Sequence, residues 1–254
     1  SWYPGNPRIL KADIEEFLDK APDGSIMGDI VGLVAPHAGY VYSGQVAGYA
    51  YKSVVGKNFD SVIVIGPSHR ALFRGVSVYD RGGYETPLGV VYVDVDLAQD
   101  MMRFDSIISA HPSAHAQEHS IEIQLPFLQV ALGDFRFVPL MMGDQNRKTC
   151  MSLADAIFRA IRNKKCLVVG SSDLSHFHSH HEAVGMDSVV LRYLETVDDE
   201  GLLRDLAHNR VEACGGGPMA VAMMVAKKLG ANKAKVMPYA NSGDITGDRD
   251  SVVG

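Results

Sequence analysis

The sequence predicts a single α/β domain in which a mostly parallel sheet is flanked by helices. Short runs of continuous apolar residues recur along the chain, which is typical of strands covered on both faces. Segments with helical periodicity lie between these runs, and this alternation indicates α/β layers. The 254 residues contain no internal repeat and no long linker rich in Pro, Gly or Ser. We therefore expect one domain over residues 1–254.

The predicted strands are short apolar runs rich in Val, Ile, Leu and Met. They lie at residues 30–35, 61–66, 136–142, 166–172 and 234–240. Residues 74–96 break this rhythm, because short alternating apolar stretches are separated there by Gly and Pro turns. That pattern predicts a β excursion inserted between α/β units.

The predicted helices are recognised by their start and stop signals. The first covers residues 7–20, with Asn6 as its cap and Pro7 in its first turn. Further helices are expected after Ser43, after Asn146 and before Gly230, over residues 44–54, 147–163 and 218–230.

Charge and cysteine usage exclude several classes of protein. The net charge is −6, the pI is near 5.9 and the basic residues are scattered, so nucleic acid and anionic membranes are not expected partners. No apolar run approaches the roughly 18 residues of a membrane span, and no signal peptide is evident, which predicts a cytoplasmic protein. The odd number of distant cysteines indicates reduced thiols, with Cys150 and Cys166 as small core residues.

Histidines follow two of the predicted strands at the point where each strand ends. His37 comes after residues 30–35 in "APHAGY", and His69 comes after residues 61–66 in "IGPSH". Ligands in open α/β sheets bind in the crevice at the carboxyl ends of the strands. We therefore expect both imidazoles to lie at one crevice.

Cys214 is the third predicted ligand of a metal ion. It stands before three glycines and an apolar helix, so its sulfur is expected near a helix N-terminus, where a thiolate is favoured. Two imidazoles and a thiolate bind transition metals and leave a coordination position open for water or substrate. The sequence thus predicts a metal site at His37, His69 and Cys214, with zinc, iron(II) and copper all compatible with the ligands.

Asp173 and His176 are the predicted catalytic pair beside this metal. They follow the strand at 166–172, and their spacing places both on one face if a helical turn begins there. A histidine oriented by a carboxylate titrates near neutral pH and moves protons. We therefore expect an acid/base role for the pair.

Glu118, His119 and Glu122 stand at an expected helix start within residues 115–128. A metal-ligating histidine usually donates its other ring N–H to a carboxylate or a carbonyl. Glu118 or Glu122 is expected to accept that hydrogen bond. His119 is expected either to line the pocket or to serve as a capping or surface residue.

Two further patterns have simpler explanations than a functional site. His178, His180 and His181 resemble a second metal cluster, but adjacent histidines in a polar run favour a solvated surface. The glycines at 215–217 resemble a phosphate cradle, but they lack the G-x-x-x-x-G-K-[ST] pattern of nucleotide-binding loops.

Seven motifs in a fixed order connect the chain to a known family. They are "SWYP", "VAPHAGYVYSG", "IGPSH", "EHSIEIQLPFL", "SSDLSH", "EACGGGP" and the closing "NSGD" with "DSVVG". Together they resemble the Memo family, whose microbial members are often named AmmeMemoRadiSam system protein B. The family fold is similar to that of class III extradiol ring-cleaving dioxygenases, which implies a single α/β domain with a central mixed sheet.

The resemblance also implies a metal at His37, His69 and Cys214, with Asp173 and His176 beside it. The related dioxygenases bind iron(II) with two histidines and a glutamate, and His176 resembles their further acid/base histidine. Cys214 stands in place of their carboxylate. Because a thiolate shifts the preference toward copper(I), zinc or a redox-altered iron, ring cleavage does not follow from the fold.

The leading hypothesis is an iron- or copper-dependent oxidoreductase that acts on an unidentified small-molecule or peptide ligand. The Memo family is linked to iron or copper and redox activity, its animal members to phosphotyrosine-containing receptor segments, and its microbial members to a radical-SAM protein and an AMMECR-type protein. A zinc-dependent hydrolase and a non-catalytic module that binds a peptide or small anion are the alternatives. Trp2, Tyr3 and Tyr40 are candidates to line a pocket for an aromatic ligand.

Overall fold

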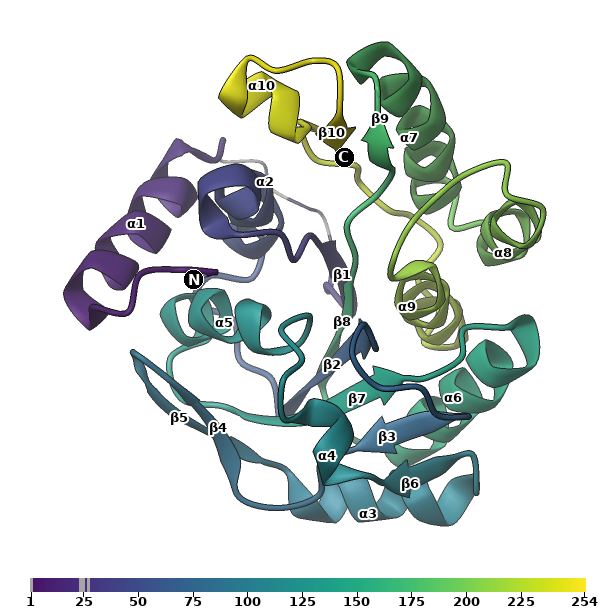
Figure 1. Cartoon of the computed structure of the whole chain (residues 1–254). Coiled ribbons are helices and arrows are strands. Elements are labelled where there is room, and N and C mark those ends of the chain that lie inside the picture. Colours follow the sequence, from purple (N-terminus) through teal and green to yellow (C-terminus); the bar gives the residue numbers. More distant parts are fainter. Residues whose placement is uncertain (1, 23–25, 27) are drawn as a thin grey trace.

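The sheet lies between two layers of helices (Figure 1). The structure is a computed structural model that describes residues 2–22, 26 and 28–254, so Ser1 of the "SWYP" motif lies outside the described residues. The strands follow one another across the sheet in the order β1-β8-β2-β7-β3-β6. They are β1 (Gly32–Ala35), β2 (Ser61–Pro67), β3 (Val76–Val78), β6 (Ile108–Ala110), β7 (Arg136–Met142) and β8 (Cys166–Ser171).

Most neighbouring strands are parallel, as predicted. The pairs β1–β8, β8–β2, β2–β7 and β3–β6 are parallel, whereas β3 runs antiparallel to β7. The excursion predicted at 74–96 contains β3, β4 (Gly83–Thr86) and β5 (Gly89–Val93). Since β5 pairs with β4 and with β7, this segment extends the sheet. The predicted α/β fold with a mixed, mostly parallel sheet is confirmed.

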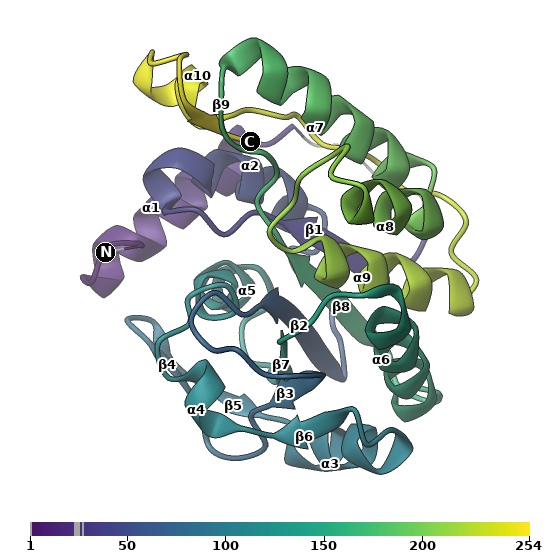
Figure 2. The ribbon, with the colours of Figure 1, turned by 45° about the vertical axis from the view of Figure 1, so that its right-hand side comes forward.

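Each face of the sheet has its own core. On one face, α1 (Pro7–Lys20), α2 (Tyr40–Lys52) and α5 (Leu125–Leu132) pack on the strands. The opposite face is covered by α3 (Val95–Phe104), α6 (Arg147–Ala160) and α9 (Gly216–Lys228). Beyond α9 lie α8 (Asp199–Ala207) and α7 (His180–Glu195), which lie side by side in the turned view (Figure 2). Cys150 and Cys166 are buried in the second core, as expected.

Shorter elements complete the chain. They are α4 (Pro112–His115), a 3₁₀ turn at Glu122–Gln124, α10 (Ser242–Thr246) and the antiparallel pair of β9 (His176–His178) and β10 (Val252–Val253). Among the described residues, no helix is long and apolar enough to cross a membrane.

Helix starts were predicted well where a side chain caps the helix. Asn6 accepts backbone N–H groups at the start of α1, and Asn146 does so at the start of α6. The predicted start after Ser43 is wrong, because α2 begins at Tyr40. Gly44 lies inside α2, and a Cβ there would be 2.5 Å from Phe17, so this glycine serves the close contact between α1 and α2.

The strand predicted at 234–240 is also wrong, since the structure assigns residues 231–240 to neither helix nor strand. Lys233 and Lys235 are exposed, and Pro238 has no backbone N–H to donate to a neighbouring strand. The segment instead borders a cavity beside β1, the strand at the edge of the sheet.

Candidate metal centre

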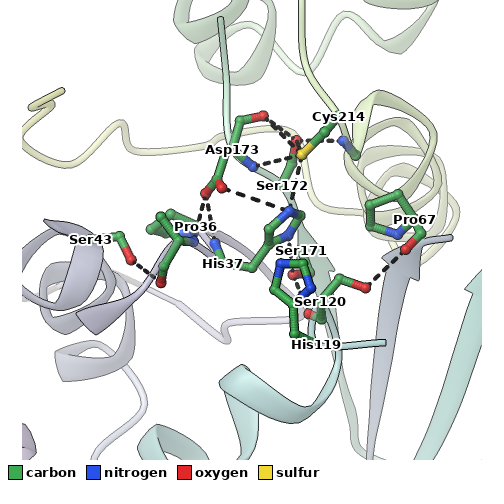
Figure 3. A network of polar contacts seen from close by, with 12 residues as sticks. Pro36, His37, Ser43, Pro67, His119, Ser120, Ser171, Ser172, Asp173 and Cys214 are labelled. Carbon is green, nitrogen blue, oxygen red and sulfur yellow. Dashed lines mark hydrogen bonds and ion pairs between the residues drawn. The ribbon is translucent and has the colours of Figure 1, made fainter. Parts of the chain in front are cut away.

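Three neighbouring parallel strands deliver polar side chains to the same edge of the sheet. His37 follows β1 by two residues, His69 follows β2 by two, and Asp173 follows β8 by two. Cys214 approaches from the start of α9, where it precedes the N-cap Gly215. Figure 3 shows the Cys214 sulfur facing the His37 ring and the Asp173 backbone. The predicted convergence of distant chain segments is therefore present.

A neutral hydrogen-bond network fixes the His37 ring. Its Nδ1 lies 2.9 Å from the Ser171 Oγ. The Ser171 hydroxyl donates its single hydrogen to the Ser120 carbonyl at 2.5 Å, so it accepts from the His37 Nδ1–H. The Nε2 lone pair then faces the Cys214 Sγ at 3.1 Å. Burial lowers the pKa of His37 to about 4, which keeps the imidazole in its neutral, ligating form.

A carboxylate fixes the His69 ring. Glu118 accepts the His69 backbone N–H at 2.6 Å and the Nδ1–H at 2.9 Å. Since a carboxylate only accepts, the neutral His69 ring carries its hydrogen on Nδ1 and its lone pair on Nε2. Burial tends to raise the pKa of Glu118, but the nearby His119 and His69 side chains and the backbone N–H groups of His69 and Ser120 outweigh it and hold this pKa well below its ordinary value.

Of the two predicted orienting carboxylates, only Glu118 contacts a predicted ligand within the described part of the chain. Glu122 instead accepts a hydrogen bond from the Tyr3 hydroxyl. Tyr40 is 5% exposed, and its hydroxyl donates to the Ile123 carbonyl at 2.8 Å, so it packs in the core. Trp2 is the predicted aromatic residue that borders the cavity at this site.

Cys214 is a neutral thiol in the metal-free protein. Burial and the negative charge of Asp173 raise the pKa of the Cys214 thiol to about 12. The predicted position before a helix is correct, but the predicted thiolate is not favoured, because burial outweighs the N-terminus of α9. A coordinating cation would reverse this balance, since metals deprotonate the thiols that bind them.

The donor atoms of His37, His69 and Cys214 fit a transition metal. They lie within 4.8 Å of one another, and bonds of roughly 2.0–2.3 Å to a central ion require little further approach. A second group, His69 with Glu118 and His119, is equally compact. The oxygens of Glu118, however, already accept N–H groups from His69, His119 and Ser120. The first group is therefore the better donor set.

Asp173 and His176 reach the site but do not pair as predicted. The Asp173 Oδ1 accepts the backbone N–H groups of His37 at 2.7 Å and Ala38 at 3.1 Å. The His176 Nδ1 donates to the Leu174 carbonyl at 2.8 Å, which leaves its Nε2 as an acceptor. The predicted helical turn is wrong because His176 begins β9. Both residues still form a compact group of potential ligands with Cys214.

His119 belongs to the wall of the site. Its ring stacks on Trp2 with a centroid distance of 3.8 Å and packs on the rings of His37 and His69. Of the two roles considered for His119, the structure places it at the pocket. Its buried Nδ1 lies 3.2 Å from a Glu118 oxygen without hydrogen-bond geometry.

Sequence reasoning missed the groups that hold His37. Ser171 accepts from the His37 ring, and the Gln124 amide donates to Ser171 at 2.8 Å and to the Pro36 carbonyl at 2.9 Å. Ser120 accepts the Ser171 hydrogen through its carbonyl. These residues are far apart in the sequence, and no local pattern marks a serine or glutamine for this purpose.

Comparisons with known proteins identify the family of this chain. A family model described as Memo-like protein matches residues 1–254. The chain is 40% identical to a MEMO1 family protein of Methanobrevibacter smithii over 266 residues, which cover 100% of this chain and 94% of that protein.

Two further relatives give the same result. A MEMO1 family protein of Methanothermobacter thermautotrophicus is 35% identical over 263 residues, covering 100% of this chain and 95% of that protein. One from Sulfolobus acidocaldarius is 40% identical over 227 residues, covering 87% and 79%. The chain belongs to the Memo family. As a Memo-family protein it has the predicted fold and a candidate site for a metal.

Proposed function

We propose that this Memo-family chain is an iron- or copper-dependent oxidoreductase whose metal is bound by His37, His69 and Cys214. The observation that carries the proposal is the state of the two imidazoles. Each donates its Nδ1–H to a fixed acceptor, Ser171 or Glu118, so each presents its Nε2 lone pair. The two histidines belong to one compact group of potential ligands with Cys214, and the His37 Nε2 lies 3.1 Å from the Cys214 sulfur.

A bound iron or copper ion would supply a redox centre with open coordination positions. The chain supplies three ligands and a neutral shell that holds them. Ser171 is itself fixed by Ser120 and Gln124, so the His37 ring has little freedom to turn away. Such support for a ligand's orientation typically matters for metal affinity.

Protons would be handled by His176 and Asp173. The His176 Nδ1–H is held by the Leu174 carbonyl, so its Nε2 is the atom that accepts or returns a proton. The Asp173 Oδ1 holds the turn that carries His37, while its Oδ2 lies 3.7 Å from the His37 Nε2. Asp173 therefore positions a ligand with one oxygen and offers the other to a proton.

The first test is the metal content of protein purified without oxygen and without a histidine tag. Wild-type protein is compared with Cys214→Ser and His69→Ala. Cys166→Ser, a buried cysteine, and His208→Ala, an exposed histidine, are the matched controls. We expect about one iron or copper ion per chain in wild type and in both controls, and its loss from the two site variants.

The second test separates the oxidoreductase from its alternatives. Wild-type protein is titrated without oxygen with dithionite and then with ferricyanide, while its paramagnetic resonance spectrum is followed. Reversible uptake of about one electron per metal ion supports the proposal. Bound zinc would favour a hydrolase, and metal-free protein that resists reconstitution would favour a non-catalytic binding module.

A further inference from the structure

Phe177 combines a strained backbone with an exposed aromatic ring. Its φ is +63°, in the left-handed region that bulky residues rarely adopt. The residue is 76% exposed, so the fold gains little from burying its side chain. Strain that the packing of the residue does not explain points to a role outside the core.

A local irregularity accompanies this strain. Phe177 lies in β9, and the register between β9 and β10 shifts between Val252 and Val253. Irregular pairing of this kind often redirects a side chain beside a functional site. On either side of Phe177, His176 begins β9 and His178 pairs with Glu212.

Phe177 stands where two cavities meet at the candidate metal centre. The first cavity has a volume of about 1150 Å³ and a mainly apolar lining, and it extends from His37 along β1. The second lies between α6, α8 and the start of α9, and it borders Cys214. His69, His176 and Phe177 line both cavities. Phe177 thus lines the same two cavities as His69, a predicted metal ligand, and His176, the predicted proton carrier.

Trp2 provides a second aromatic group at the rim of the first cavity. It is 43% exposed and is held by its stacking on His119. A purely polar ligand would gain little from two exposed aromatic rings, whereas a planar apolar group would pack on them.

We propose that Phe177 is a substrate-contacting residue that packs against a planar, apolar group of the molecule bound at the metal. The inference rests on the proposed function, because it places the polar end of that molecule at the metal. It names the substrate class: a compound with a metal-ligating end attached to an aromatic or conjugated portion.

The test compares two hydroxamic acids that bind metals through the same two oxygens. Acetohydroxamic acid carries a methyl group, and benzohydroxamic acid carries a phenyl group. Their affinities are measured with metal-loaded wild type, Phe177→Gly and Phe177→Leu. Phe104→Leu, which changes an exposed phenylalanine at the end of α3, is the matched control.

We expect Phe177→Gly to lower the affinity for benzohydroxamic acid by about three- to tenfold, the usual range for one aromatic contact. The affinity for acetohydroxamic acid should be unchanged in Phe177→Gly. For benzohydroxamic acid, the affinity of Phe177→Leu should lie between those of Phe177→Gly and wild type, and that of Phe104→Leu should match wild type. The melting temperature of Phe177→Gly should not fall, because glycine accepts a positive φ without strain. A purely structural role for Phe177 would lower it.

The proposal is overturned if Phe177→Gly lowers the affinity for both acids equally or leaves the affinity for benzohydroxamic acid unchanged. If the protein holds no metal, the proposed function fails by itself, and saturation-transfer NMR then tests the contact in metal-free protein. Transfer to the phenyl protons that is weaker in Phe177→Gly than in wild type supports the Phe177 contact. Equal transfer overturns it.

Discussion

The loops after β1 and β2 place their histidines in opposite environments, although both histidines follow their strand by two residues. The His37 side chain is 2% exposed, whereas that of His69 is 32% exposed. His37 is held by the neutral Ser171 hydroxyl, and His69 is held by the Glu118 carboxylate. The same sequence pattern thus produces one buried candidate ligand held by a neutral hydroxyl and one accessible candidate ligand supported by a charge.

This difference indicates how the two ligands contribute to metal binding. A carboxylate that accepts the ring N–H increases the electron density at the other nitrogen and so strengthens the ligand. His37 has no such partner, and burial is the main cause of its lowered pKa, with a further contribution from His69 and His119. We therefore expect metal affinity to depend more on Glu118 than on Ser171.

The largest effect is expected for Glu118→Gln. The variant keeps the size of the side chain but removes the charge that orients His69, so metal affinity should fall about 10- to 100-fold. A chelator competition assay measures this. Glu122→Gln is the control, since Glu122 contacts Tyr3 rather than His69, and its affinity should stay near wild type. Equal losses in the two variants would contradict the assigned role of Glu118.

The pH dependence of metal binding sharpens the comparison. The pKa of His37 is lowered to about 4, so its imidazole is already neutral near neutral pH. The Cys214 thiol, with a pKa of about 12, is still protonated and must release its proton to the metal. Affinity should therefore rise about tenfold per pH unit between about pH 7.5 and 9.5. A flat profile in the competition assay would exclude the thiol as a ligand.

Ser171→Ala should have a smaller effect on the metal than Glu118→Gln. The change removes the acceptor of the His37 ring N–H and leaves the Gln124 amide and the Ser120 carbonyl short of a partner. The free energy of unfolding in urea should fall by about 1–3 kcal/mol, while metal affinity falls only severalfold. A loss of affinity larger than that of Glu118→Gln would reverse the proposed order of the two supports.

The smallest effect concerns β1 itself, which leads to His37 from the edge of the sheet. The carbonyl of Val31 accepts from Val168 in β8, and that of Ala35 accepts from Ser172 just after β8, so the backbone N–H groups of Leu33 and Ala35 also face β8. The N–H groups of Gly32 and Val34 face the cavity and should exchange faster with solvent in an NMR experiment. Equal protection would mean that residues 234–240 pair with β1 after all.

Local signals in the sequence predicted much of this molecule. Buried parallel strands have continuous apolar runs, and Asn6 and Asn146 cap their helices through contacts within one turn. The positions of His37 and His69 were predicted from a topological rule, because the carboxyl ends of parallel strands lie at the same edge of a sheet. These features depend on short stretches of chain and on one topological rule.

The errors arose where tertiary packing decides. Ser43 was expected just before a helix start but lies inside α2, and the apolar run at 234–240 lacks a paired neighbour. The Ser171 hydroxyl acquires its role only when residues 37, 120, 124 and 171 come together. The partner of His176 is a backbone carbonyl, and the sequence does not distinguish one carbonyl from another.

X-ray absorption spectroscopy of the metal-loaded wild-type protein tests the central claim most directly. The account predicts one sulfur ligand at about 2.3 Å and two imidazole nitrogens at about 2.0–2.1 Å, as in other protein sites with these ligands. The sulfur contribution should disappear in Cys214→Ser and persist in Cys166→Ser. A wild-type spectrum with only nitrogen and oxygen ligands would contradict a metal centre built from His37, His69 and Cys214.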